Sequence, residues 1–247
     1  MKEGMVGSKT YLLLCILFLS ISVNSQTMMS SGKITFERRT NLEKRFADQE
    51  SRGWMKGKMK EPKIDEFELR FTDSTAIFIP ILPEVPDERE WATMQNTTYQ
   101  NLNSGELIQQ FSFWGTQVLM KDTVEEREWI ITGSSREIAG YNCRQAMWEA
   151  NDSTRIYAWY ADELMASVGP ETFNGLPGVI LGLGIEDGGV VYFAKKIEKL
   201  DDPNIEKKIP TGKKKDWYTE DQLKDLITER FSQWGQVDRI LFDMFVW

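Results

Sequence analysis

The chain has 247 residues, no histidine, and 30 Lys and Arg against 38 Asp and Glu, which gives a net charge of −8. Without histidine, neither a Ser-His-Asp triad nor a His-ligated metal site can form. The acidic balance argues against nucleic acid as a partner, because nucleic-acid-binding proteins present basic faces.

The first 25 residues have the pattern of a cleaved secretory signal. Lys2 and Lys9 form a positive start, and an apolar run follows at 11–23 (YLLLCILFLSISV). This run is shorter than the about 20 residues that span a bilayer, so we expect cleavage after Ser25 and no transmembrane segment in the mature chain. The predicted location is the periplasm or the extracellular space. Only Cys143 then remains, and its strand-like surroundings predict burial rather than a reactive thiol.

Strand patterns dominate residues 26–205. Ile64, Phe67, Leu69 and Phe71 alternate with charged residues, and Thr72-Asp73 leads to an apolar run at 74–79, which predicts an antiparallel hairpin. Further strands are predicted at 33–39, 97–102, 106–111, 117–121, 129–132, 143–148, 155–160, 178–185 and 190–200. The expected fold is mainly β: a single antiparallel, curved sheet, similar to a half-barrel, with one or a few C-terminal helices.

Two other segments break the strand series. Residues 81–94 contain Pro83 and Pro86 among acidic residues and are expected to form an exposed loop. Residues 206–247 are expected to form a linker, an amphipathic helix and an apolar tail packed on the same domain. Thr219 and Gln222 have the spacing of a capping box, which predicts a helix starting there.

The segment 158–185 (AWYADELMASVGPETFNGLPGVILGLGI) is the most distinctive part of the sequence. Gly175, Pro177 and Gly178 predict a structural turn, of type II about Pro177-Gly178, in which Gly178 takes a positive φ. The strand that follows, 179–185, is apolar on both faces and is expected to be covered on both. Gly182 and Gly184 face one side, and we expect room for another group there.

The motif Gly175-Leu176-Pro177-Gly178-Val179-Ile180 resembles the GLPGLI family of exported Bacteroidetes proteins, with Val179 where the family name has Leu. Segments 129–132, 138–143, 158–160 and 168–170 resemble the family's usual succession, so the resemblance covers about 30–200. It implies export, a β-rich fold and a cell-envelope setting. The family has no established activity to transfer.

Three functions remain open, and the first is a non-catalytic binding module for an acyl chain or a hydrophobic peptide. The curved sheet could enclose such a ligand among its aromatic residues, although the same residues would also serve as a core. No cofactor is expected. The candidate ligand-binding residues are Trp159, Tyr160, Phe173, Leu176, Gly182 and Gly184.

The second function is a periplasmic adaptor of an outer-membrane transporter, with the 81–94 loop and the tail to Trp247 as contact surfaces. The third is a carboxylate-based hydrolase, for which the candidates are Glu125-Glu126, Asp162-Glu163, Glu171 and Glu186-Asp187. The sequence has no phosphate loop, nucleophile elbow or metal-ligand spacing, so we favour binding over catalysis.

Overall fold

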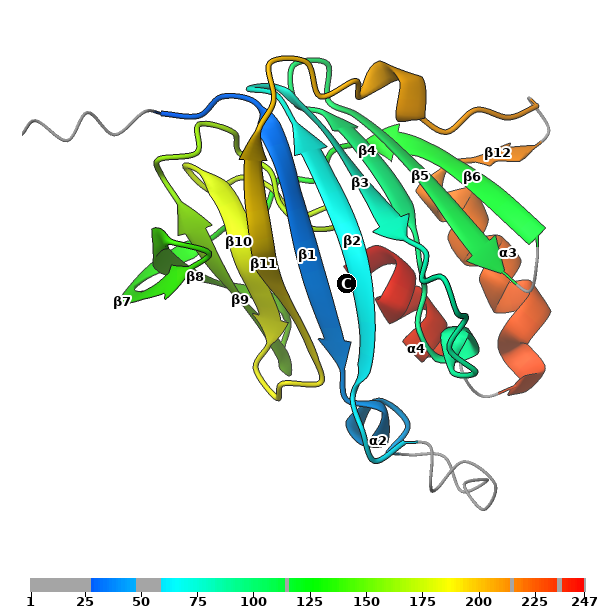
Figure 1. The fold of residues 1–247 in the computed structure, drawn as a ribbon. Helices are drawn as coiled ribbons and strands as arrows, with labels where there is room; N and C mark the ends of the chain where they lie inside the picture. Colours follow the sequence, from blue (N-terminus) through cyan, green and yellow to red (C-terminus); the bar gives the residue numbers. More distant parts are fainter. Residues whose placement is uncertain (1–27, 48–58, 114–115, 214–215, 235–236, 247) are drawn as a thin grey trace, which may run out of the picture.

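The computed structural model describes residues 28–47, 59–113, 116–213, 216–234 and 237–246. Its main feature is one curved 12-stranded sheet in the order β12-β6-β5-β4-β3-β2-β1-β11-β10-β9-β8-β7 (Figure 1). Neighbouring strands are antiparallel except β12, which pairs with β6 in parallel. The predicted fold class, mainly β with a few short helices near the C-terminus, is confirmed. The proposed signal at 1–25 and Trp247 lie outside the described residues.

The strands follow the predicted series closely. Their bounds are β1 Gly32–Thr40, β2 Lys63–Phe71, β3 Thr75–Ile81, β4 Thr97–Asn101, β5 Glu106–Phe113, β6 Thr116–Thr123, β7 Ile130–Ile138, β8 Tyr141–Asn151, β9 Thr154–Ala161, β10 Val179–Ile185, β11 Val190–Lys199 and β12 Trp217–Tyr218. The predicted β2–β3 hairpin is confirmed, and β10 and β11 also pair in antiparallel. β1 lies in the middle of the sheet, between β2 and β11.

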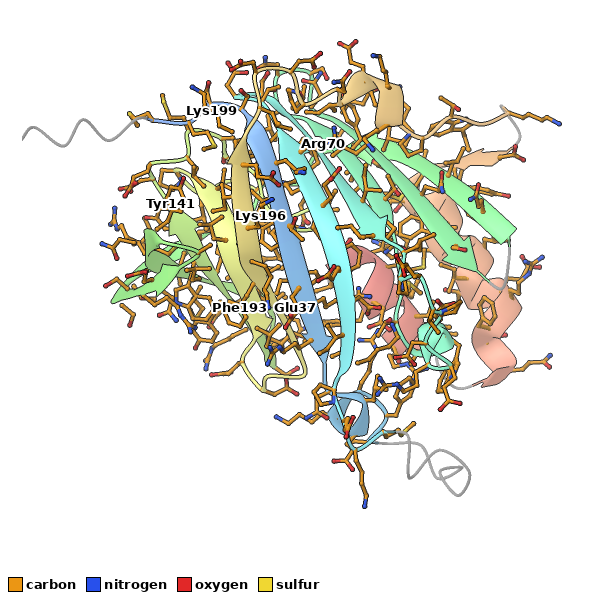
Figure 2. The ribbon with its side chains drawn as sticks, viewed as in Figure 1. Glu37, Arg70, Tyr141, Phe193, Lys196 and Lys199 are labelled. Carbon is orange, nitrogen blue, oxygen red and sulfur yellow. The ribbon has the colours of Figure 1, made fainter. Side chains whose placement is uncertain are left out.

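The sheet has two different faces. Phe36, Phe67 and Tyr192 lie on the face that we call the inner face, where all three are fully buried. The opposite, outer face carries Glu37 and Lys196, and Figure 2 shows them turned toward the viewer. One prediction is corrected here: Ile64 is 52% exposed, while Asp65, two residues before Phe67, takes the buried position.

The C-terminal helices cover the inner face at one end of the sheet. They are α3 (Glu220–Phe231) and α4 (Val237–Leu241), continued by a π-helical turn at Phe242–Val246. Figure 1 shows α3 and α4 behind the sheet. The predicted capping box is confirmed, because the Thr219 side chain accepts from Gln222 N–H and the Gln222 side chain accepts from Thr219 N–H. Leu223, Ile227 and Met244 pack with the β5 and β6 core residues.

Shorter helices complete the fold. They are α2 (Leu42–Arg45) and the 3₁₀ turns at Glu90–Ala92, Glu206–Lys208 and Ser232–Trp234. None of the helices in the described part of the chain combines the length and the apolar character needed to cross a bilayer. Ile205 lies on the outer face and packs with Ile77, Tyr99 and Ile108. The outer face of β3–β5 is therefore covered as well.

Gly178 takes the positive φ predicted for it, at +149°. A Cβ at this position would lie 2.2 Å from the Ala161 carbonyl oxygen, so the close backbone approach also requires glycine. The turn type is corrected: Gly178 N–H donates to the Leu176 carbonyl at 2.8 Å, which closes a three-residue turn about Pro177. β10 then runs buried from Val179 to Gly184, as predicted.

Candidate functional site

The structure divides the six predicted ligand residues between the two faces of the sheet. Gly182 pairs with Trp159 and Phe193, and this group lies on the outer face. Tyr160 pairs with Ile180 and is fully buried on the other side of β9, and Phe173 and Leu176 are also buried. Ligand binding by these residues stays a prediction, and they do not form one continuous surface.

The outer side of Gly182 is filled by neighbouring side chains. A Cβ there would lie 2.8 Å from Ile138 Cδ1, 3.3 Å from the Trp159 ring and 3.4 Å from the Phe193 ring. The Arg136 guanidinium lies 5.1 Å from the centres of both rings. Gly184 is less crowded, because a Cβ added there would lie 3.5 and 3.6 Å from the Val191 methyl groups. The expected room over Gly182 is therefore occupied by β7, β9 and β11.

Cys143 lies next to this region and is fully buried, as predicted. Burial raises the pKa of its thiol to about 11. A thiol with this pKa is almost entirely protonated at neutral pH, so its nucleophilic form is scarce.

On the inner face, the loop between β9 and β10 crosses under the sheet and contributes a buried carboxylate. Arg38 donates to Asp65 Oδ2 at 2.8 and 3.3 Å, to the Tyr192 hydroxyl at 3.2 Å and to the Met94 carbonyl at 2.6 Å. The Tyr192 hydroxyl donates to Glu171 Oε1 at 2.7 Å. We call Arg38, Asp65, Glu171 and Tyr192 the buried network. It joins β1, β2 and β11 to the crossing loop.

More polar side chains hold the Asp65 carboxylate and the backbone of Glu171. Asp65 also accepts from Lys63, Thr93 and Gln95. Gln100 donates to the Glu171 backbone carbonyl at 3.1 Å. Glu171 has a φ of +54°, which is costly for a residue other than glycine, so the bond from Gln100 helps to keep the loop in this strained conformation.

The pKa values of the two carboxylates shift in opposite directions. Burial raises the pKa of Glu171 above its usual range, and the nearby Arg38 and Tyr192 only partly oppose this. Burial acts the same way on Asp65, but Arg38 and Lys63 outweigh it and lower the pKa of Asp65. Asp65 is therefore the carboxylate that neutralises Arg38 most effectively.

A small cavity of about 10 Å³ lies beside the buried network. Thr40 Oγ1, Asn96 Oδ1 and Glu171 Oε2 are buried there without a hydrogen-bond partner among the described residues. Their polar atoms and this volume suit a single water molecule. The cavity is too small for an organic ligand.

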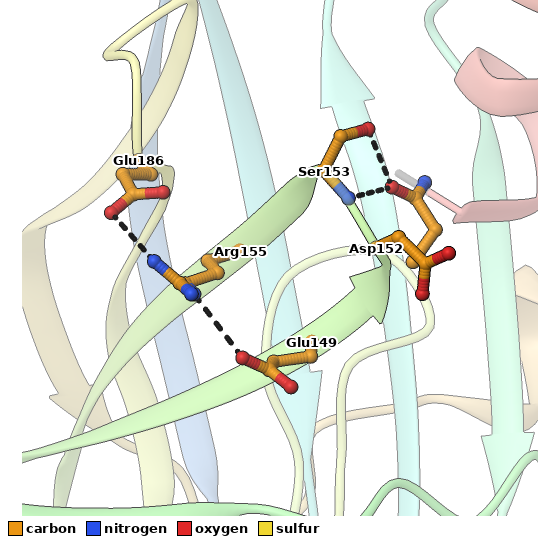
Figure 3. Close-up of a pocket in the computed structure, with 6 residues that line it drawn as sticks. Glu149, Asp152, Ser153, Arg155 and Glu186 are labelled. Carbon is orange, nitrogen blue, oxygen red and sulfur yellow. Dashed lines mark hydrogen bonds and ion pairs between the residues drawn. The ribbon is translucent and has the colours of Figure 1, made fainter.

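A larger hollow of about 430 Å³ lies at the end of the β8–β9 hairpin (Figure 3). Arg155 bridges Glu149 at 3.2 Å and Glu186 at 3.5 Å, and Asp152 and Ser153 complete the rim. Arg155 and Glu149 are both about half exposed, and exposed ion pairs of this kind contribute little binding energy or stability. We call this opening the polar hollow, because all of its lining residues are polar or charged.

The third opening, of about 550 Å³, lies between the end of β6, the end of β8 and the C-terminal helices. We call it the C-terminal groove. Its lining combines six apolar residues with six polar or charged residues, four of them acidic: Trp148, Ala150, Leu241, Phe242, Phe245 and Val246 with Asp122, Thr123, Glu125, Glu220, Lys224 and Asp238. Small-molecule and peptide sites have this size and this mixture of apolar and polar groups.

The groove walls are held by specific contacts. Asp122 at the end of β6 accepts from Glu220 N–H at 2.9 Å and so fixes the start of α3. Lys224 pairs with Glu220 one helical turn away, and its Nζ lies 5.2 Å from the centre of the Phe245 ring. On the other wall, Trp148 packs edge-on against Phe173 at 6.2 Å.

Arg127 closes the back of the groove from behind Trp148. Its guanidinium lies 5.0 Å from the Trp148 ring and 4.6 Å from the Phe173 ring. It donates to the Thr172 carbonyl and hydroxyl, both at 2.9 Å, and pairs with Glu125. Phe173 is therefore the predicted ligand residue that supports the groove: it packs against Trp148 and Arg127 without lining the opening itself.

The carboxylates proposed for hydrolysis lie in separate places. Glu171 belongs to the buried network, Glu186 to the polar hollow and Glu125 to the C-terminal groove. Across the described residues, no cluster of three or more His, Cys, Asp or Glu side chains has an arrangement that could hold a metal ion.

The comparison with known families matches one short stretch. A family described as "Protein of unknown function (Porph_ging)" matches residues 146–182, from β8 through the crossing loop to β10. This agrees with the expectation of a family without established activity, and the GLPGLI resemblance itself stays a prediction. No curated protein matches the chain.

Among solved structures, two crystal forms of PNGF-II are similar in fold. The P21 form has a TM-score of 0.55 and 15% identity and covers 80% of this chain. The C2 form has a TM-score of 0.51 and 14% identity and covers 76% of this chain. The chain spans about a third of the length of PNGF-II, at 33% and 30% of the two forms. At this identity the likeness shows the fold alone.

Proposed function

We propose that this protein is a non-catalytic binding module that holds a hydrophobic ligand in the C-terminal groove. The observation that carries the proposal is the 550 Å³ opening, whose lining includes Trp148, Phe242 and Phe245. Most other aromatic side chains of the inner face are fully buried against one another, as Phe67 and Phe78 are, stacked at 4.7 Å. Here the aromatic side chains are only partly buried and face open space.

The groove also has walls that can keep its shape. One wall is β8, which pairs with β9 along most of its length, and the other is α3, anchored to β6 through Asp122. Sites formed on strands and helices lose less conformational entropy on binding than sites on free loops. Binding therefore needs no large rearrangement of the sheet.

The test uses N-phenyl-1-naphthylamine, an uncharged apolar dye that fluoresces when it leaves water. We expect saturable binding of one dye molecule by the full chain. Ala150→Phe fills the groove from β8 and should weaken binding at least tenfold. Ile131→Phe adds bulk at an exposed position outside the groove lining, 48% exposed, and should bind like the wild type.

Hydrogen exchange of the wild-type protein provides a second measurement that does not depend on a variant. Dye should increase protection at residues 148–150 and 237–246. The proposal fails if the wild type shows no saturable binding, or if protection appears elsewhere. It also fails if Ala150→Phe keeps the wild-type affinity and melting midpoint.

The adaptor function has an observation of its own in its favour. Leu82 is 72% exposed, Val85 81% and Trp91 53%, all in the acidic loop between β3 and β4. Several exposed apolar residues in one loop are typical of a contact surface. If the protein is an adaptor, Leu82→Ser combined with Val85→Ser should release an outer-membrane transporter that the wild type retains from solubilised envelopes.

Both functions assume export from the cytoplasm. N-terminal sequencing of the protein from a cell envelope or culture medium should begin at Gln26. A cytosolic protein that still starts at Met1 would contradict the export step and leave the groove proposal to its own test.

A further inference from the structure

The charges around the C-terminal groove are unbalanced. Four carboxylates line it, from Asp122, Glu125, Glu220 and Asp238, against one lysine. Lys224 pairs with Glu220, and Arg127, just behind the lining, pairs with Glu125. These two cations leave the groove with a net negative charge.

Asp238 is the carboxylate best placed to meet a ligand. It is exposed in the first turn of α4, and no hydrogen bond or ion pair joins it to another side chain in the described part of the protein. Asp122, by contrast, uses both oxygens, one for Glu220 N–H and the other for Thr123 N–H. A cation in the groove would therefore gain most from Asp238.

One cation already uses the aromatic lining. Lys224 Nζ lies 5.2 Å from the centre of the Phe245 ring, within the range in which a ring face attracts a cation. Because Lys224 holds this place, a ligand cation would gain its attraction from Asp238. A fatty acid would instead bring its own carboxylate against those of the groove.

From this complementarity, and resting on the proposed function, we infer that the groove binds a short peptide segment in which apolar side chains flank a lysine or arginine. Apolar side chains would cover Trp148, Phe242 and Leu241. The basic side chain would reach Asp238, and the peptide backbone could bond to the polar rim, which includes the Thr123 hydroxyl.

The experiment compares two pentapeptides, acetylated and amidated, that differ only at the centre: Leu-Phe-Lys-Leu-Phe and Leu-Phe-Glu-Leu-Phe. Calorimetry with the full chain should show at least tenfold tighter binding of the lysine peptide at low salt. The difference should shrink at high salt, because mobile ions screen partly exposed charges.

Asp238→Asn provides the matched variant. It should weaken the lysine peptide about threefold to tenfold, and it should not weaken the glutamate peptide, because the repulsion between Asp238 and the central glutamate is removed. Asp152→Asn, which removes an exposed acid from the polar hollow, is the control and should alter neither peptide.

The outcomes separate this inference from the proposed function. Equal affinities for the two peptides, or no effect of Asp238→Asn, would overturn the charge selectivity. Failure of both peptides while the uncharged dye still binds would overturn the peptide ligand and leave the hydrophobic groove standing. Failure of peptides and dye together would overturn the proposed function as well.

Discussion

The inner face of the sheet is completed in two different ways. Under β1, β2 and β11 the crossing loop fills the space, and Arg38, Asp65 and Glu171 end up buried. Between the ends of β6 and β8 the C-terminal helices leave an open groove with exposed acids. The first region uses its charges to hold the fold, whereas in the second the charges are available to a ligand. The distinction depends on burial and not on residue type.

The largest expected effect in this comparison comes from Arg38→Met. It would leave Asp65 and Glu171 buried without their shared cation, and breaking a buried ion pair in this way costs about 3–5 kcal/mol. Urea unfolding should show this loss. Asp238→Asn in the groove should change the free energy of unfolding by less than about 0.5 kcal/mol. Similar effects of the two substitutions would contradict the distinction between the regions.

Gly178→Ala should have the next largest effect. The new methyl group would overlap the Ala161 carbonyl at a φ of +149°, and we expect a loss of about 2–4 kcal/mol. Gly140→Ala is the matched control, because Gly140 also has a positive φ (+84°) but its added Cβ would meet nothing within 4 Å. The control should lose about 1–2 kcal/mol. Equal losses would show that backbone strain alone, without the close approach, explains the glycine.

The smallest expected effect is a pH dependence of stability within the buried network. Because the pKa of Glu171 is raised in the folded protein, its favourable contribution is present below about pH 4.5 and is lost as pH rises through the folded pKa. Asp65 has a lowered pKa, so its contribution is present above about pH 3.8 and is lost as pH falls through the folded pKa.

Two variants separate these contributions in unfolding measured across pH. Relative to wild type, Glu171→Gln should become more stable as pH rises, whereas Asp65→Asn should become less stable. Both variants keep Arg38 and Tyr192, so the cation and the hydroxyl group beside the substituted carboxylates are the same in the two proteins. Parallel pH profiles for the two variants would contradict opposite pKa shifts.

The strands are predictable because they depend on local patterns. Alternation identifies β2 and its hairpin partner, and the Thr219 cap places the start of α3. One misassignment is instructive: apolar character groups Ile64 with Phe67, although Asp65 has the parity of Phe67, Leu69 and Phe71. The same parity joins Arg38 to Ile34 and Phe36 on β1. A charged residue that continues an apolar stripe is the available signal for the buried network.

The C-terminal groove could not be predicted in the same way. Its walls come from β6, β8 and α3–α4, and no local pattern specifies how far the two ends of a curved sheet approach each other. Trp148 and Phe242 have the same apolar character whether they face a core or an opening. Only the bend of the sheet, with register shifts such as the one between Glu149 and Asn151, decides this.

The central place of β1 has a consequence for the order of folding. The Arg38–Tyr192 hydrogen bond joins residues 154 positions apart. One edge of β1 pairs with β2, and the other edge pairs with β11. A nascent chain that has not reached residue 190 therefore leaves the middle of its own sheet unpaired. The sheet therefore stays incompletely assembled until β11 has been made, and contacts this distant in sequence also make folding slow.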